Sequence, residues 1–212
     1  MTVLTNKKFL SLLLALALLL SLPSPAFATI TERKSQEAEE LIWSTLSEHS
    51  PSDVITAGVM GYFWRESQFK SDSVTGWATL KARDGFDLCG YVVSKTDSGM
   101  EDGSSRGWFV EAVRNCGGFG LGQWYSVDYL EALYDYAREN GASIADAEMQ
   151  CAFVIASLKE NTELWEELTA TDDPAEAGRL IAVYYDSSVD GAPYMGYCAA
   201  YYYNMFHKED EE

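Results

Sequence analysis

Apolar residues recur at spacings of three and four along much of the chain, which predicts a mostly α-helical protein. Residues 32–50 show this spacing on one face, as expected for an amphipathic helix. Residues 54–64 are apolar on all sides, which is typical of a helix buried in a core. This second helix follows Ser50, Pro51 and Asp53, which favour a helix start because Ser can cap, Pro suits the first position and an acid suits the positive end.

Helical spacing returns after residue 117. Ser126 can cap the first helix of this part, and Gly141 can end it. Further helices are expected at residues 126–140, 143–159, 162–168, 173–185 and 194–206. The last of them is rich in aromatic residues, whose helical spacing favours core packing for most of them over a surface platform for sugars. These residues are Tyr194, Tyr197, Tyr201, Tyr202, Tyr203 and Phe206.

Residues 71–117 interrupt the helical pattern. Gly, Ser and Asp are frequent in this stretch, and no clear helical period is visible. Residues 74–80 and 88–93 can form short strands, so a small β-hairpin is expected there. A structureless loop of this length is uncommon unless it has a function. The sequence therefore predicts a mostly α domain with one long, irregular insertion.

The N-terminal segment has the features of a secretory signal peptide. Lys7 and Lys8 precede an apolar run at residues 9–20, and residues 26–28 form a small-x-small cleavage site. The run is too short to span a bilayer comfortably, and no other apolar stretch is long enough, so no stable membrane insertion is expected. An uncleaved N-terminal anchor is the alternative. The expected organisation is a signal peptide at 1–28, a folded domain at 29–207 and an acidic tail at 208–212.

The chain is strongly acidic, with 15 Lys and Arg against 33 Asp and Glu and a net charge of −18. The expected signal peptide contains two of the Lys residues and no acid, so its removal makes the balance more negative still. This charge excludes nucleic acid as a natural partner, since phosphate contacts need Lys and Arg. It suits a secreted, soluble protein, which we expect to be a monomer.

The chain has four cysteines, an even number that is typical of two disulfides in an exported protein. They are Cys89, Cys116, Cys151 and Cys198. Three pairings are possible. The favoured one joins Cys89 to Cys116, which would staple the insertion, and Cys151 to Cys198, which would tie two helices. A catalytic thiol would need a His base, and neither of the two His lies near a Cys in the sequence. No metal-ligand spacing is visible, so no metal or other cofactor is expected.

Glu66 is an unusual residue for its position, because it ends a helix that is otherwise suited to full burial. Tyr62 and Phe63 lie four and three residues before it and share its face of the helix. Aromatic surroundings would raise the pKa of this carboxyl and allow it to donate a proton to a leaving oxygen. The simpler interpretation is an ion pair with Arg65 or another base at the helix end.

The segment 117–124 is rich in glycine, which lets its backbone approach another backbone or a ligand closely. Gln123 offers a donor and an acceptor to sugar hydroxyl and N-acetyl groups. Trp124 and Tyr125 offer flat faces for sugar rings. A plain turn before a helix explains the same residues without a function.

Taken together and in this order, the two features resemble the motifs of the phage tail lysozyme family. The first is Met60-Gly61-x-x-x-x-Glu66-Ser67-x-Phe69, and the second is Gly118-Phe119-Gly120-Leu121-Gly122-Gln123-Trp124. The chain is similar, more distantly, to goose-type lysozymes and soluble lytic transglycosylases, which share a Glu-Ser pair at a helix end and a later Gly-Leu-x-Gln segment. The resemblance covers about residues 52–69 and 117–206.

The resemblance implies a lysozyme-like helical domain in which Glu66 is the general acid. It also implies that Gln123 lines the sugar cleft, together with a Tyr of a later helix, for which Tyr184 and Tyr185 are the nearest matches. With Ser67 beside the acid, and Trp124 and Tyr125 beside the glutamine, these are the expected substrate-binding residues: Ser67, Gln123, Trp124, Tyr125, Tyr184 and Tyr185.

A second catalytic carboxylate is not identified by any motif. The candidates are Asp84, Asp87, Asp97, Asp102 and Asp186. An inverting hydrolase holds its two carboxyl groups about 6.5–9.5 Å apart, with a water between them. A lytic transglycosylase needs no such water, because the 6-hydroxyl of the substrate attacks. Both reactions remain open at this stage.

The expected function is therefore cleavage of peptidoglycan glycan strands by a secreted enzyme that associates with the cell wall. The acidic surface is awkward for this function, because bacterial walls carry anionic polymers too. The main alternative is a non-catalytic lysozyme-like module that binds wall glycan or a protein partner, in which Glu66 is structural. A secreted interaction protein without a role in sugar binding would fit the acidity but leaves the two motifs unexplained.

Overall fold

The computed structural model of the chain describes residues 25–74, 87–186 and 191–207. The predictions for residues 1–24 of the signal peptide and for the acidic tail at 208–212 lie outside these residues. The described part is mostly helical, as the sequence predicts. Its helices are α2 (Pro25–His49), α3 (Asp53–Ser67), α5 (Leu88–Asp97), α6 (Arg106–Arg114), α7 (Val127–Glu139), α8 (Ala147–Glu160), α9 (Thr162–Ala170), α10 (Pro174–Asp186) and α11 (Ala192–Phe206).

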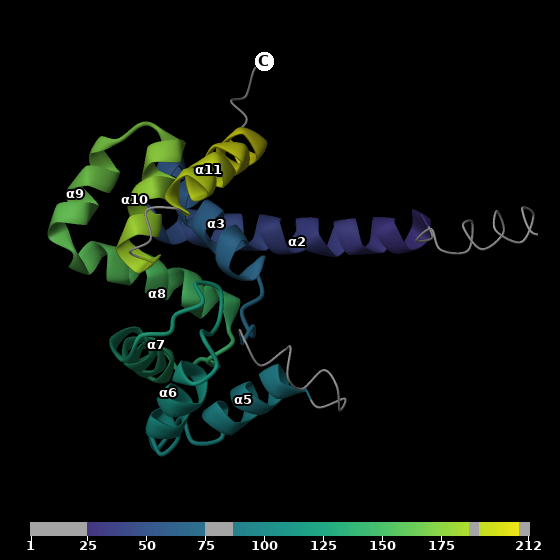
Figure 1. Cartoon of the computed structure of the whole chain (residues 1–212), viewed down its shortest axis with the longest axis vertical. Coiled ribbons are helices and arrows are strands. Elements are labelled where there is room, and N and C mark those ends of the chain that lie inside the picture. The colour runs from purple at the N-terminus through teal and green to yellow at the C-terminus, as the bar shows by residue number, and fades with distance from the viewer. Residues whose placement is uncertain (1–24, 75–86, 187–190, 208–212) are drawn as a thin grey trace, which may run out of the picture. The chain divides into compact units, whose positions relative to one another are not determined.

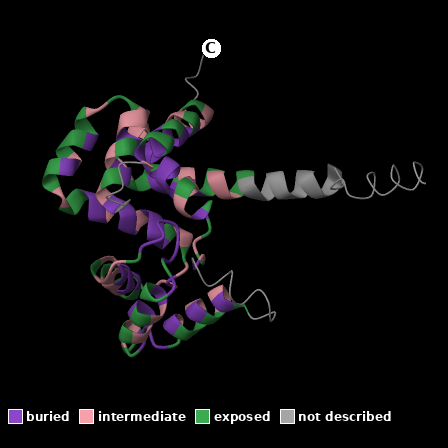
Figure 2. Cartoon of the chain, viewed as in Figure 1, coloured by how far each residue is buried: buried purple, intermediate pink, exposed green. Residues whose placement is uncertain are grey.

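The described residues from 40 onward pack together as one unit, and residues 25–39 belong to another. Within the larger unit, α3 packs against α10 and α11, while α8 contacts both α7 and α9 (Figure 1). Buried residues concentrate on α3 and α8 (Figure 2). No helix in the described part of the chain is both long enough and apolar enough to cross a membrane.

The central helix α3 starts and ends as its sequence predicts. The Ser52 side chain accepts a hydrogen bond from the backbone N–H of Ile55, and Asp53 lies in the first turn, where the helix dipole favours an acid. Residues 55–63 are all buried. The helix ends at Gln68, whose left-handed backbone conformation (φ 52°) turns the chain away.

Glycines let α3 approach its two neighbours closely. A Cβ atom on Gly61 would lie 2.5 Å from the Met195 carbonyl oxygen and 2.7 Å from the Ala199 backbone nitrogen, both of α11. A Cβ atom on Gly58 would lie 2.9 Å from the Ile181 side chain of α10. Such distances are too short for a carbon atom, so the close packing of α3 on α10 and α11 depends on glycine at these two positions.

The strand predicted at residues 88–93 is wrong, because these residues belong to α5. The Asp87 side chain caps this helix by accepting a hydrogen bond from Gly90 N at 3.0 Å. Its buried residues Leu88, Val92 and Thr96 follow a spacing of four. The β-branched residues suggested a strand, but burial of one helical face decides the structure. The predicted hairpin is not seen in the described residues, where pairing of the β type is limited to isolated bridges.

The insertion is more ordered than predicted, because α5 and α6 attach it to α7. Buried Ser105 hydrogen-bonds both the Thr96 carbonyl at 2.6 Å and the Tyr134 hydroxyl at 2.9 Å. Arg106 donates two hydrogen bonds to the Asp135 carboxylate at 2.8 and 2.6 Å. The described part of the segment 71–117 is therefore packed against the helical domain and not an irregular excursion.

The expected disulfides are absent from the structure, in which none of the four cysteines is bonded to another. Cys116 Sγ instead donates to the Ala112 carbonyl oxygen at 2.7 Å, one turn earlier in the chain. Cys198 hydrogen-bonds Tyr194, also one turn earlier. Cys151 is fully buried, and this burial raises the pKa of its thiol, which disfavours the reactive thiolate. These sulfurs are accommodated by local contacts and burial.

The aromatic residues of α11 divide between the core and the surface. Tyr202 is buried, and Phe206 stacks on Trp43 of α2 with ring centroids 4.9 Å apart. Core packing was predicted for most of the six aromatic residues of this helix, but three of them are exposed. They are Tyr194, Tyr197 and Tyr201.

Substitution Gly61→Ala tests the close packing of α3 on α11. We expect the free energy of unfolding to fall by about 1–3 kcal/mol, because the added methyl group meets backbone atoms that cannot rotate away. The control is Gly107→Ala in α6, where a Cβ atom would have no neighbour within 4 Å. We expect that control to gain about 0.4–1 kcal/mol from the stiffer unfolded chain. Urea unfolding measures both, and equal stability of Gly61→Ala and the native chain would contradict the packing argument.

Candidate active site

Three segments of the chain meet in a cleft of about 280 Å³. The end of α3 supplies one wall, the glycine-rich segment 117–125 supplies the second, and tyrosines of α7 and α10 supply the third. The residues that line the cleft are Tyr62, Arg65, Glu66, Gly117, Gly122, Gln123, Trp124, Tyr125, Tyr129 and Tyr185. The two sequence motifs, which are separated by about fifty residues, are thus neighbours in space.

Most of the residues proposed from the sequence line this cleft: Glu66, Gln123, Trp124, Tyr125 and Tyr185. Glu66 is half-buried in the last turn of α3. Two of the proposed residues lie elsewhere. Ser67 is buried and its hydroxyl donates to the Phe63 carbonyl oxygen at 3.1 Å, within the helix. Tyr184 lines a separate hollow against α9, so Tyr185 is the tyrosine of this pair that faces the cleft.

The glycine-rich segment forms a tight turn whose two ends pair with each other. Phe119 and Trp124 exchange both backbone hydrogen bonds, each at 3.1 Å. A Cβ atom on Gly118 would lie 2.5 Å from the Gln123 carbonyl oxygen. Gly120 has a φ of +74°, a backbone conformation that residues other than glycine rarely adopt. The prediction that these glycines allow close approach of the backbone is confirmed.

Two side chains that the sequence did not assign to this turn hold it in place. The Tyr62 hydroxyl of α3 donates to the Gly122 carbonyl oxygen at 2.5 Å. Gln150 of α8 is fully buried, and its Oε1 accepts from Leu121 N at 2.8 Å. Its Nε2 donates to the carbonyl oxygens of Ser71 and Ile144. A single glutamine in an otherwise apolar stretch of helix was the signal that could have identified it.

Gln123 is held in a conformation that costs energy. Its φ is 47°, in the left-handed region, where residues other than glycine are uncommon. Its Nε2 donates to the Gly120 carbonyl oxygen at 2.8 Å and the Ser73 carbonyl oxygen at 3.2 Å. Its Oε1, like the indole Nε1 of Trp124, is buried without a hydrogen-bond partner in the described part of the chain. A buried polar atom without a partner costs about 1–3 kcal/mol, and such exceptions call for a functional explanation.

Tyrosines form the wall opposite the glycine-rich turn. The rings of Tyr62 and Tyr185 stack with centroids 4.9 Å apart and an angle of 10° between planes. The Tyr185 hydroxyl hydrogen-bonds Ser157 of α8. Full burial raises the pKa of Tyr185 well above its ordinary value. Burial, and then the hydrogen bond with Tyr184, also raise the pKa of Tyr129. Both phenol groups therefore stay protonated and uncharged well into the alkaline range.

The candidate second carboxylates from the sequence do not join this site in the described residues. Asp87 caps α5, and Asp97 accepts hydrogen bonds from Ser143 Oγ and Ile144 N. Asp102 accepts from the backbone N–H of Ser104. Asp84 and the side chain of Asp186 lie outside the described residues. Glu66 is the one carboxylate among the described residues that line the cleft.

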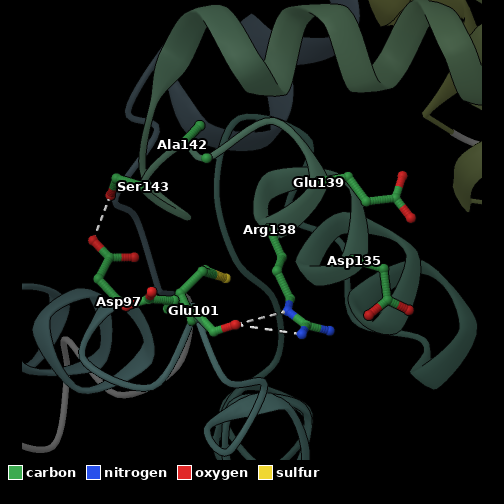
Figure 3. Close-up of a pocket in the computed structure, with 9 residues that line it drawn as sticks. Asp97, Glu101, Asp135, Arg138, Glu139, Ala142 and Ser143 are labelled. Carbon is green, nitrogen blue, oxygen red and sulfur yellow. Dashed lines mark hydrogen bonds between the residues drawn. The ribbon is translucent and has the colours of Figure 1, made fainter.

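A larger hollow of about 760 Å³ lies between α5, α7 and the turn that precedes α8 (Figure 3). Two of its acidic side chains, those of Asp97 and Asp135, are engaged in structural hydrogen bonds. The Asp97 carboxylate points at the Ser143 hydroxyl, 2.6 Å away, and the Arg138 guanidinium reaches the Glu101 carbonyl oxygen (Figure 3). These hydrogen bonds join α5, α7 and the turn before α8, so we interpret the hollow as a structural junction between these elements. The described residues contain no group of three or more His, Cys, Asp or Glu side chains able to hold a metal ion.

The raised pKa values of Tyr129 and Tyr185 predict a loss of stability at high pH. The free energy of unfolding should fall as pH rises above about 10, because Tyr129 and Tyr185 lose their protons there only in the unfolded chain. In Tyr185→Phe this fall should be less steep, by about 1.4 kcal/mol per pH unit, which corresponds to one proton. The control Tyr197→Phe removes a phenol that is 71% exposed and should keep the native slope. Urea unfolding between pH 8 and 11 measures the slopes, at about one-unit steps; identical slopes in all three proteins would contradict this interpretation of burial.

Comparison with known proteins adds one finding. The family model for phage tail lysozyme matches residues 37–206. No curated protein and no solved structure matches the chain significantly. The matched region contains α3, the glycine-rich turn and the whole of the cleft. Because the match covers most of its length, the chain belongs to the phage tail lysozyme family, which implies a lysozyme-like role in cleaving peptidoglycan.

Proposed function

We propose that this protein cleaves the glycan strands of peptidoglycan, with Glu66 as the general acid that protonates the glycosidic oxygen. The observation that carries the proposal is the position of Glu66. It lies in the last turn of α3, whose residues 55–63 are buried, and lines a cleft whose other described residues are aromatic, apart from two glycines, Gln123 and Arg65. Cleavage of a glycosidic bond needs a carboxylic acid that delivers a proton to the leaving oxygen, in a site that excludes bulk water.

The walls of the cleft suit an N-acetylated sugar. Tyr125 is 53% exposed at the cleft and offers a ring face for stacking. The Gln123 Oε1 atom is an acceptor and the Trp124 Nε1 atom is a donor, and neither has a partner among the described residues. An acetamido group offers the complementary donor and acceptor. Both protein atoms are covered in the free chain, so such a contact requires a small rotation of the side chains.

The supporting structure explains how these groups can stay in place during the reaction. Tyr62 shares a face of α3 with Glu66, and its hydroxyl holds Gly122 of the turn. Gln150 holds the neighbouring residue Leu121 from the other side. The acid and the substrate-binding turn are therefore fixed to each other by hydrogen bonds. Such preorganisation favours catalysis, because a misplacement of about 1 Å can reduce the rate about a hundredfold.

Substitution Glu66→Gln is the direct test of the proposal. Digestion of purified peptidoglycan by the mature protein should yield soluble fragments, and the variant should lose at least about a hundredfold in rate, because an amide cannot donate the proton. Mass spectrometry of the fragments identifies the reaction, since a reducing end means hydrolysis and an anhydro sugar means transglycosylation.

Two controls accompany this experiment. Glu111→Gln changes an exposed Glu of α6 outside the cleft and should leave the rate unaltered. Circular dichroism shows whether the Glu66→Gln variant is folded. No cleavage by the folded native chain, or full activity of Glu66→Gln, would overturn the proposal and favour a binding module.

The proposed activity would take place outside the cell, in the wall. Lys7, Lys8, the apolar run and the cleavage site at residues 26–28 support export by a signal peptide. We expect the exported protein to begin at Thr29, and N-terminal sequencing of protein collected from the medium measures this. A protein that begins at Met1 and sediments with membranes would instead indicate an uncleaved anchor.

A further inference from the structure

Among the described residues that line the candidate cleft, Arg65 is the one cation. Arg65 directly precedes Glu66 on α3 and is exposed. It makes no ion pair or hydrogen bond with any described side chain, whereas Arg106 pairs with Glu131 and Asp135. The other described residues of the cleft lining are uncharged, apart from Glu66. The chain has 33 acidic residues, yet none in the described part neutralises this guanidinium.

The position of Arg65 follows from the helix. Tyr62, four residues before Glu66, lies on the cleft side of α3. Gly61, four residues before Arg65, faces Met195 and Ala199 of α11. Arg65 therefore lies on the edge of the cleft that borders α11, beside the proposed acid. Burial raises the pKa of Cys198 in α11, while the charge of Arg65 opposes this rise, which agrees with the same position.

Stabilisation of the C-terminal end of α3 does not by itself explain the Arg65 side chain. A cation in the last turn stabilises a helix by about 0.3–1 kcal/mol, and Lys would do so equally well. Lys70, Lys95 and Arg114 also lack an acidic partner among the described residues, but none of them lines the cleft. The feature that needs an explanation is a guanidinium that lines the cleft beside the proposed acid and has no acidic partner among the described residues.

A guanidinium is suited to one kind of ligand group. Its planar fork donates two parallel hydrogen bonds to a carboxylate, and these charge-assisted bonds are about twice as strong as neutral ones. Peptidoglycan can present a carboxylate at this place in two ways. The lactyl group of the muramoyl sugar is a free carboxylate when no peptide is attached, and the peptide stem carries its own carboxylates when it is present. Chitin consists of N-acetylated sugars and has neither group.

We infer that Arg65 binds a carboxylate borne by the glycan strand next to the scissile bond, so that it selects muramoyl-containing strands over neutral ones. This inference rests on the proposed function, because it assigns the substrate class of the same cleft. The guanidinium contributes to selection of the substrate, and Glu66 contributes the proton.

The test compares kcat/KM on three substrates for the native chain, Arg65→Gln and Arg65→Lys. The substrates are intact peptidoglycan strands, strands stripped of peptide by an amidase, and chitin oligosaccharides. We expect the preference for a carboxylate-bearing substrate over chitin oligosaccharide to fall about 10-fold in Arg65→Gln, mainly through KM, as for the loss of one charge-assisted hydrogen bond. Arg65→Lys should retain part of the preference, since Lys keeps the charge but not the fork.

The two sources of the carboxylate give different patterns. A loss confined to stripped strands identifies the lactyl carboxylate, and a loss confined to intact strands identifies the peptide stem. The matched control is Arg114→Gln, which removes an exposed cation at the end of α6, outside the cleft, and should keep the native preference. Thermal unfolding of each variant shows whether it is folded.

The outcome that overturns the inference is an equal effect of Arg65→Gln on all three substrates, including no effect on any. If the native chain cleaves none of them, the proposed function has failed. Calorimetric binding of the same strands then decides the inference separately: a native preference for carboxylate-bearing strands that Arg65→Gln loses supports it, and equal binding by both proteins overturns it. If chitin oligosaccharides bind but are not cleaved, calorimetry gives their affinity, which is then compared with the affinity for the carboxylate-bearing strands.

Discussion

The burial of α3 on all sides is the constraint on which the rest of the domain depends. A helix with an apolar surface all round must be enclosed, and α10 and α11 provide the enclosure. The contact with α11 is so close that a Cβ atom on Gly61 would lie 2.5 Å from the Met195 carbonyl oxygen. Enclosure stops at the last turn, where Arg65 is exposed and Glu66 is half-buried. The rigid core therefore ends where the cleft begins, and the proposed acid is carried by a structural element that has little freedom to move.

The sequence predicted this helix and the residues around the cleft, because both depend on local patterns. The all-round apolar run, its Ser52 cap and the dense glycines of the turn are each explained by neighbouring residues. The contacts that attach the turn were not predictable in the same way. Tyr62 reaches Gly122 across 60 positions and Gln150 reaches Leu121 across 29, and no local pattern specifies such partners. The choice of Tyr185 over Tyr184 also depends on how α10 is rotated in the fold.

The errors have physical causes as well. Residues 88–93 contain β-branched side chains that favour strands in isolation, but a capped helix buries Leu88 and Val92 against the rest of the domain. The cysteines suggested disulfides by their even number alone, although Cys116 finds an acceptor within its own helical turn. On α11, the spacing favoured core packing for most of the aromatic residues, yet Tyr194, Tyr197 and Tyr201 are exposed on a helix that packs against α3 and α10. In each case the tertiary environment overrides a pattern that several structures could share.

The order of the elements along the chain has a consequence for how the cleft assembles during folding. Tyr62 of α3 stacks on Tyr185 of α10, although the two residues are separated by about 120 positions in the sequence. Contacts between such distant segments require closure of a long loop, which costs chain entropy before any contact repays it. We therefore expect the helices to form before the cleft does, and the cleft to be complete only when the packing of α3 on α10 is complete.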